Sequence, residues 1–561
     1  MKVKKNNYYI LTILSFGLVS LIFLYSTSFF SKFINVITFF NGLNSSPSIV
    51  LDSDFLNYIK NEQNQINVSK YFLKIKLLYK KKEIESYISI KGTIKNLKTP
   101  NLIFNFSDGY DIKYLKLNNC YPRYKYKNDK IIIEAKNIKL DSFNVEIKYC
   151  GKPIAKGFGS FVFDKINNKS IIYTLNEPIF ASTWMPCNDK PDDKAFFEVK
   201  ITNTNNFISV SNGILVDTMS FDDLKTYHYK TLYPISTYLI SIYSAEYKYY
   251  EDYVVCNNDT IRLVYYITNQ KNIKKYIDFS PHKKGIQIFS KLFGNYPFIK
   301  EKYGIAEISW KYGAIEHQTI TGISTNIIKS PDFYESVFVH ELAHHWWGDA
   351  VGLKSWKDIW LNEGFATYSE ALYYEQKAGN KALKSTMNSF VANFEHSTLY
   401  NPTTDLFSRL QYFKGAWVLH MLRSELGNEL FFKCLRSYYS TYLYKNASTE
   451  DFKNICEKVS SKNLDYFFYQ WVYKGKGVIN LKYHWKQDSS KIFINLKQFN
   501  NNVEYHFPLK IKLVQNNNIF NVQSFYIFNC DTTLIINNTD KISEIVLDPE
   551  NELLIKDIKN N

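Results

Sequence analysis

Alternating apolar and polar residues mark two separate stretches of the chain as rich in β-strands. Runs such as 71–79 and 143–149 alternate in this way and are bounded by Asn, Asp or Gly, which is typical of half-buried strands. We therefore expect an all-β domain over residues 56–255. The same alternation returns near the C-terminus, as in 492–496, and predicts a β-sandwich over residues 477–561.

Between these stretches the spacing of apolar residues becomes that of helices. Segments 413–423 and 430–439 repeat apolar residues every three or four positions, which predicts a mostly helical domain over residues 256–476. The 561 residues are too many for one domain, and the predicted fold class is α+β with several domains. A further helix is predicted from Glu363 to Ala378, with core positions Ala366, Tyr368, Leu372 and Tyr373.

The N-terminal region contains an uncharged, mostly apolar run from Tyr8 to Phe30 that is long enough to cross a bilayer. Lysines precede it, so the N-terminus is expected to stay in the cytoplasm and the rest of the chain to lie outside. We expect an uncleaved single-pass anchor over residues 1–31, in a bacterial cell membrane, followed by a linker over residues 32–55. A cleaved signal peptide is the alternative.

Composition argues against nucleic acid as a partner. The net charge is +16, but the lysines are dispersed, and Lys, Asn, Ile, Tyr and Phe are abundant together, as codon bias in an AT-rich genome would produce. No basic patch with a known binding motif is present. The seven cysteines include no C-x-x-C pair, so they predict neither a metal site nor a disulfide framework.

The pattern His340-Glu-Leu-Ala-His344 carries the chemistry of the chain. Residues four apart share one face of a helix, so two imidazoles can bind one metal ion while Glu341 remains free to act as a base. Catalytic zinc takes three protein ligands and one water. Glu363, with 18 residues between it and His344, is the expected third ligand. Two surface histidines are the alternative, but the apolar surroundings over 336–348 argue against it.

Together with other blocks, this pattern resembles the zinc aminopeptidases of the M1 (gluzincin) family. The blocks occur in the family's order, and the match spans about residues 60–550. The resemblance implies a β saddle domain, a thermolysin-like catalytic domain and a C-terminal β-sandwich. The matching blocks are Glu177–Pro191, Gly313-Ala-Ile-Glu-His317, His340–His344, Trp360-Leu-Asn-Glu-Gly-Phe-Ala366 and Tyr412-Phe-Lys-Gly415.

The resemblance also implies roles for individual residues and one Zn²⁺ per chain. Glu341 is expected to act as general base and then acid, and Tyr412 to donate a hydrogen bond to the oxyanion. Peptides are the expected substrates. Glu316 and Glu177 are expected to bind their free α-ammonium, because an ammonium leaving water needs a fixed anion. Gly313 and Ala314 are expected to contact the peptide.

The chain departs from the family pattern in three ways. Ile315 replaces a usual Met, and His317 replaces a usual Asn, which is expected to change contacts with the peptide backbone. The helical C-terminal domain of larger members is expected to be missing, which predicts a more open cleft.

Two other functions are compatible with parts of this pattern. One is a thermolysin-like zinc endopeptidase, which would also cleave peptides with a blocked N-terminus. The other is a catalytically inactive, membrane-anchored binding protein. The sequence does not give the preferred N-terminal residue or the oligomeric state.

Overall fold

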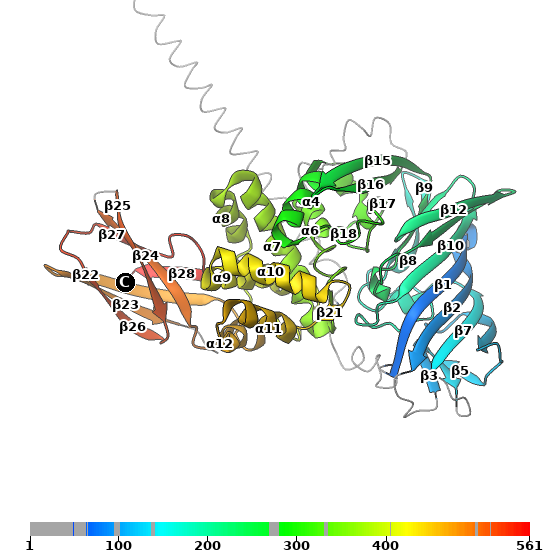
Figure 1. Ribbon diagram of the computed structural model, residues 1–561, viewed down its shortest axis with the longest axis horizontal. Helices are drawn as coiled ribbons and strands as arrows, with labels where there is room; N and C mark the ends of the chain where they lie inside the picture. Colours follow the sequence, from blue (N-terminus) through cyan, green and yellow to red (C-terminus); the bar gives the residue numbers. More distant parts are fainter. Residues whose placement is uncertain are drawn as a thin grey trace, which may run out of the picture.

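The computed structural model describes residues 49, 63, 65–94, 101–135, 141–268, 280–329, 335–403, 405–499, 503–515 and 518–560. Within these residues the chain forms three parts that lie in a row (Figure 1). A β-rich N-terminal part and a strand-rich C-terminal part flank a helical part. The structure thus has the predicted multidomain α+β character, while the predicted domain boundaries stay a prediction.

The largest sheet of the N-terminal part has seven strands. Its strands are β1 (Ile66–Leu78), β2 (Glu83–Ile94), β4 (Asp111–Leu117), β7 (Ser142–Gly151), β10 (Phe196–Thr204), β12 (Ile214–Phe221) and β13 (Leu224–Lys230). They are ordered β12-β13-β10-β1-β2-β7-β4. Only β1 and β10 pair in parallel. In β7 every second side chain, from Phe143 to Tyr149, is buried, which confirms the strand predicted from alternation.

Two smaller sheets complete this part. One is ordered β3-β6-β5 and the other β11-β14-β9-β8. Their strands are β3 (Asn101–Asn105), β5 (Tyr124–Lys127), β6 (Lys130–Glu134), β8 (Ser160–Ile166), β9 (Lys169–Leu175), β11 (Ile208–Ser211) and β14 (Ile242–Ala245), with short 3-10 turns η2 (Tyr79–Lys81), η3 (Ala181–Thr183) and η4 (Thr237–Leu239) nearby.

A five-stranded sheet links the β-rich part to the helices. Its strands are β15 (Tyr247–Cys256), β16 (Asp259–Thr268), β17 (Tyr303–Ile308), β18 (Ala314–Ile315) and β19 (Thr321–Ser324), in the order β15-β16-β17-β19-β18. One sheet therefore contains strands from both sides of residue 255, so the segment predicted to be helical begins with strands. The short strand β18 pairs with β19 alone and forms one edge of this sheet.

The helical part surrounds a core rich in aromatic residues. Its helices are α4 (Ser280–Phe293), α5 (Thr325–Ile328), α6 (Glu335–Ala343), α7 (Trp360–Ala378), α8 (Asn380–Ser389), α9 (Gly415–Leu426), α10 (Asn428–Tyr442), α11 (Thr449–Ser460) and α12 (Asp465–Phe468). Between them lie the 3-10 turn η5 (Trp356–Asp358), the π-helical turns η6 (Leu410–Lys414) and η7 (Tyr469–Tyr473), and the paired strands β20 (Gly352–Leu353) and β21 (Asn446–Ala447).

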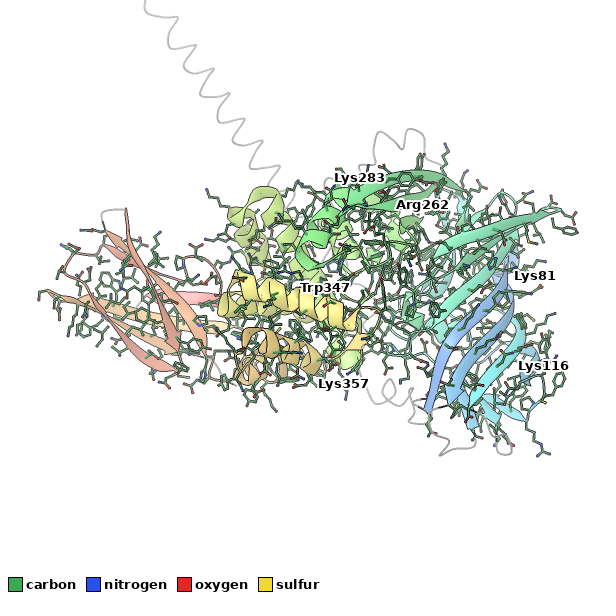
Figure 2. The ribbon with its side chains drawn as sticks, viewed as in Figure 1. Lys81, Lys116, Arg262, Lys283, Trp347 and Lys357 are labelled. Carbon is green, nitrogen blue, oxygen red and sulfur yellow. The ribbon has the colours of Figure 1, made fainter. Side chains whose placement is uncertain are left out.

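The helix predicted from Glu363 to Ala378 is confirmed as α7. All four of its predicted core positions are buried. A π-helical turn precedes α9, however, so the regular helix begins at Gly415 and not at Phe413. In the side-chain view Trp347 lies among the helices, while Lys81, Lys116, Lys283 and Lys357 lie far apart on the surface (Figure 2).

The C-terminal strands form two sheets, in agreement with part of the predicted β-sandwich. One is ordered β26-β23-β22-β28 and the other β25-β24-β27. The strands are β22 (Ile479–Gln487), β23 (Lys491–Gln498), β24 (Phe507–Gln515), β25 (Asn518–Ile527), β26 (Asp531–Asn537), β27 (Glu544–Leu547) and β28 (Ile555–Asn560).

The predicted membrane location requires correction. In the part of the chain that the structure describes, no helix combines the length and the apolar character needed to cross a bilayer. The predicted anchor over residues 1–31 lies outside the described residues.

Two glycines allow α7 and α9 to cross in direct backbone contact. A Cβ atom on Gly415 would lie 2.7 Å from the Cα of Gly364, and one on Gly364 would lie 2.8 Å from the Cα of Gly415. Both distances are shorter than carbon atoms tolerate. The crossing brings Glu363, one residue before the first glycine, towards Tyr412, three residues before the second.

Replacing Gly415 by alanine should therefore destabilise the protein. Helix propensity alone predicts that alanine would raise the free energy of unfolding by about 1 kcal/mol, since Gly415 has a helical φ of −56°. The steric overlap should outweigh this gain and lower the free energy of unfolding by about 1–3 kcal/mol. Urea unfolding followed by tryptophan fluorescence measures this change. Ser385→Ala, on an exposed position of α8, is the propensity control and should change stability little. A more stable Gly415→Ala variant would contradict the close crossing.

Candidate active site

His340, His344 and Glu363 converge in the arrangement that a zinc ion needs. The Nε2 atoms of the two histidines lie 3.1 Å apart, and Oε2 of Glu363 lies 3.5 Å from one and 3.6 Å from the other. Zinc holds N and O ligands at about 2.0–2.1 Å, so tetrahedral neighbours are separated by about 3.3 Å. The three ligand atoms therefore fit a zinc ion without rearrangement of the helices.

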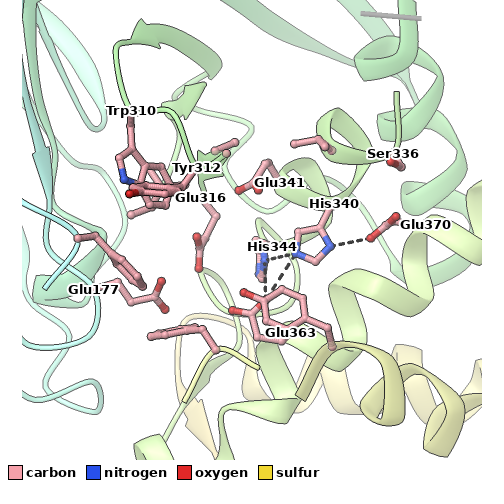
Figure 3. A pocket seen from close by; sticks show the side chains of 17 residues that line it. Glu177, Trp310, Tyr312, Glu316, Ser336, His340, Glu341, His344, Glu363 and Glu370 are labelled. Atoms are coloured by element: carbon pink, nitrogen blue, oxygen red, sulfur yellow. Dashed lines mark hydrogen bonds and ion pairs between the residues drawn. The ribbon is translucent and has the colours of Figure 1, made fainter. Parts of the chain in front are cut away.

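Hydrogen bonds on the far side of each imidazole turn Nε2 towards this point. His340 donates from Nδ1 to Oε1 of Glu370 at 2.8 Å, and His344 donates from Nδ1 to the Trp347 carbonyl at 3.1 Å. Because Nδ1 carries the hydrogen in both rings, both Nε2 lone pairs are available to a metal. Glu370 is seven residues after Glu363 on α7, so both carboxylates project from one face of the helix (Figure 3).

Four carboxylates crowd the same region with almost no exposure to water. Glu177, Glu316, Glu341 and Glu363 are each at most 5% exposed. One oxygen of each has no hydrogen-bond partner among the described residues. Such a group of buried carboxylates is unfavourable until positive charge enters it.

The carboxyl pKa values reflect this crowding. Burial and the neighbouring Glu316 and Glu363 raise the pKa of Glu177 well above its usual range. Burial likewise raises the pKa of Glu341 to about 8, against the lowering effect of the two imidazoles. Burial would also raise the pKa of Glu363, but His344 and His340 lower it to about 2. Glu363 is thus the carboxylate best suited to remain ionised as a ligand.

All nine residues predicted from the sequence to form the site line one cavity of about 730 Å³, its open mouth included. Figure 3 shows Glu177 and Glu316 on one side of the metal ligands and Glu370 on the other. The elements that supply these residues come from distant parts of the chain. The predicted residues are Glu177, Gly313, Ala314, Glu316, His340, Glu341, His344, Glu363 and Tyr412.

Tyr412 reaches the cavity from the π-helical turn η6. Its ring stacks on that of His340, with centroids 5.7 Å apart and 14° between the planes. Burial and the nearby Glu363 raise the pKa of Tyr412 well above its usual range. The hydroxyl therefore stays protonated and can donate a hydrogen bond. The wide turn agrees with the frequent occurrence of π-bulges at functional sites.

His317, which was expected to change contacts with the peptide backbone, lies behind the cavity, so this expectation stays a prediction. It is fully buried, does not line the cavity, and accepts a short hydrogen bond at Nδ1 from the Tyr243 hydroxyl. The departure from the family pattern at position 317 therefore lies behind the side chains that line the cavity. Ile315, the other departure, does line the cavity.

Sequence reasoning missed two groups of cavity residues. Glu370 had a detectable signal, since it lies two helical turns after Glu363. The second group is an aromatic wall at one end of the cavity, which had no such signal in a chain that is 17% aromatic. Its members are Phe158, Trp310, Tyr312 and Phe407.

Removing the Glu370 carboxylate should weaken metal binding. In Glu370→Ala, the Nδ1 hydrogen of His340 loses its acceptor, so zinc affinity should fall about 10–100-fold. Competition with a chromogenic chelator measures this affinity. The control is Glu375→Ala on the same helix, which removes a carboxylate that pairs with Arg423 outside the cavity. Equal zinc affinity in the two variants would argue against the orienting role of Glu370.

Comparison with known families matches most of the described chain. The model of the "Peptidase family M1 domain" matches residues 278–471, and that of the "Peptidase M1 N-terminal domain" matches residues 67–239. Together these matches cover well over half of the chain and include every candidate site residue.

Individual relatives are more distant. The chain is 24% identical to "Probable aminopeptidase 1" of Sulfurisphaera tokodaii over 434 residues, which cover 72% of this chain and 54% of that protein. It is 28% identical to "Aminopeptidase M1" of Arabidopsis thaliana over 352 residues, 58% of this chain and 40% of the relative. The chain thus spans about half the length, or less, of these curated relatives.

Solved structures share the fold. An M1 zinc metallopeptidase from Deinococcus radiodurans matches with a TM-score of 0.64 at 22% identity, covering 73% of this chain and 93% of that one. Aminopeptidase A of Legionella pneumophila, in complex with aspartic acid, matches with a TM-score of 0.78 at 16% identity, covering 88% and 60%. From the two family models and the metal-ligand geometry, we conclude that the chain belongs to peptidase family M1.

Proposed function

We propose that the protein is a zinc aminopeptidase that removes the first residue of a peptide. One observation carries this proposal: Glu177 and Glu316 present carboxylate oxygens within 4.8 Å of each other and of Glu363, a predicted metal ligand. A free α-ammonium placed between the first two carboxylates therefore lies beside the metal site. The peptide bond nearest to an α-ammonium is the first one, so this spacing favours an exopeptidase.

His340, His344 and Glu363 would hold the zinc ion, which when bound would supply a water of lowered pKa and a Lewis acid for the carbonyl of the bond to be cleaved. Glu341 is next to His340, and one of its oxygens has no partner among the described residues. We propose that Glu341 accepts a proton from the attacking water and later transfers it to the leaving amine.

Tyr412 and strand β18 complete the proposed machinery. The Tyr412 hydroxyl is protonated and lies in the same cavity, so it can stabilise the oxyanion of the tetrahedral intermediate. Gly313 and Ala314 lie at the edge of the five-stranded sheet, where peptide groups remain available to an extended substrate. We also propose that the three parts of the chain are a β saddle domain, a thermolysin-like catalytic domain and a C-terminal β-sandwich.

Replacing Glu341 by glutamine should abolish peptide hydrolysis while leaving the metal in place. Loss of a general base typically costs 10²–10⁴-fold, so kcat on aminoacyl-fluorophore amides should fall by about three orders of magnitude. Zinc content, measured by atomic absorption, should be unchanged. Glu335→Gln is the control, because Glu335 begins the same helix and pairs with Lys377. Undiminished hydrolysis by Glu341→Gln would refute the mechanism.

A blocked N-terminus should abolish cleavage. An acetylated peptide lacks the ammonium that Glu177 and Glu316 would bind, so mass spectrometry should find the free peptide shortened and the acetylated one intact. Glu316→Gln should lower kcat/KM on the free peptide by about two orders of magnitude, since loss of one partner of a buried charge pair costs about 2–5 kcal/mol. Internal cleavage of the acetylated peptide would favour an endopeptidase instead.

A further inference from the structure

We infer that Phe158, Trp310 and Phe407 form the binding site for the first side chain of the peptide and select a large apolar one. This inference rests on the proposed aminopeptidase function. It goes further by naming the class of substrate, which the sequence did not give, and by assigning part of the selection to a turn of the β-rich domain.

The three rings close one end of the cavity. Phe158 lies at the centre of the group, with its ring centroid 5.6 Å from that of Trp310 and 5.5 Å from that of Phe407. Tyr312 extends the wall, with its ring 6.0 Å from Trp310. Trp310 is 8% exposed and Phe407 is 7% exposed, so both are held by packing. The result is a fixed apolar surface that a bound side chain can complete.

The position of this wall relative to the carboxylates defines what it contacts. In Figure 3, Trp310 and Tyr312 lie on the side of Glu316 that faces away from His340 and His344. The first Cα of a peptide carries an ammonium, a carbonyl and a side chain. With the ammonium between Glu177 and Glu316 and the carbonyl towards the metal ligands, the aromatic wall is the surface left for the side chain.

Phe158 is held in place by an unusual turn between β7 and β8. Gly157, Gly159 and Ser160 all have positive φ, at +54°, +129° and +57°. The Ser160 hydroxyl donates to the Lys156 carbonyl at 2.8 Å and accepts from the Lys156 amide at 3.0 Å. A Cβ on Gly157 would lie 1.9 Å from the Phe180 ring. The turn therefore depends on its glycines and presents Phe158 to the cavity in one preset orientation.

The chemistry of the wall favours apolar side chains over charged ones. The wall consists of four aromatic residues and contributes no charged group of its own. A charged side chain would lose its hydration against these rings, and an acidic one would also be repelled by Glu177. A small side chain such as alanine leaves the rings uncovered. Since each buried carbon is worth about a factor of four, leucine should exceed alanine by about 50-fold in kcat/KM.

The test compares aminoacyl-fluorophore amides of Leu, Phe, Met, Ala, Arg and Glu on the zinc-loaded full chain. We expect kcat/KM for Leu, Phe and Met to exceed that for Ala, Arg and Glu at least tenfold. Phe158→Ala should reduce the Leu-to-Ala ratio of kcat/KM at least fivefold, and Phe158→Leu should restore most of this ratio. Phe163→Ala, a half-buried phenylalanine on β8 outside the cavity, is the matched control.

Two outcomes would overturn the inference. One is a wild-type enzyme that cleaves Ala, Arg or Glu substrates as well as Leu. The other is an unchanged Leu-to-Ala ratio in Phe158→Ala with an unaltered melting temperature. Calorimetry can measure the same selectivity without catalysis, as the difference in binding affinity between leucine amide and alanine amide. If no substrate is cleaved but leucine amide binds at least tenfold more tightly than alanine amide, the proposed reaction fails and the binding site stands. If no substrate is cleaved and the two amides bind equally, both the proposed reaction and the proposed binding site are refuted.

Discussion

Four carboxylates that share one buried cavity impose the constraint on which this structure depends. Glu177, Glu316, Glu341 and Glu363 lie too close together, and too far from water, to be ionised at once without compensating cations. A divalent metal held by His340, His344 and Glu363 would satisfy part of this demand. An ammonium between Glu177 and Glu316 satisfies another part. The proposed affinity for a free peptide N-terminus would then follow from the same electrostatic imbalance that favours a metal.

The cavity exists only where two parts of the chain meet. Glu177 and Phe158 come from the β-rich part, whereas the metal ligands come from α6 and α7. Hydrogen bonds join these parts, including those from Lys194 Nζ to the carbonyls of Asp349 and Ala350 at 2.6 and 3.0 Å. The β-rich domain is therefore a structural component of the cavity, and both of the proposed selectivities, for a free N-terminus and for the side chain, depend on how firmly it is docked.

The sequence was most informative where chemistry imposes a fixed spacing. The interval within His340–His344, and that from His344 to Glu363, follow from one metal bound between two helices, so short-range periodicity was sufficient to find the ligands. The strands β16 to β19 were missed because they lie within a segment dominated by helical spacing, and β17, β18 and β19 are also short, with six, two and four residues. The aromatic wall was missed for a different reason. Phe158, Trp310 and Phe407 become neighbours only through docking of the two domains, and no local pattern in the chain reports that contact.

The backbone contact between Gly364 and Gly415 separates the proposed reacting groups from the groups proposed to select the substrate. It sets the approach of Glu363 and Tyr412 through main-chain atoms, with no side chain between the helices to be exchanged. The aromatic wall, in contrast, is made of side chains carried by a surface turn and two loops. Mutations could therefore remodel substrate preference in this lineage step by step, while the catalytic geometry remains insulated from each change.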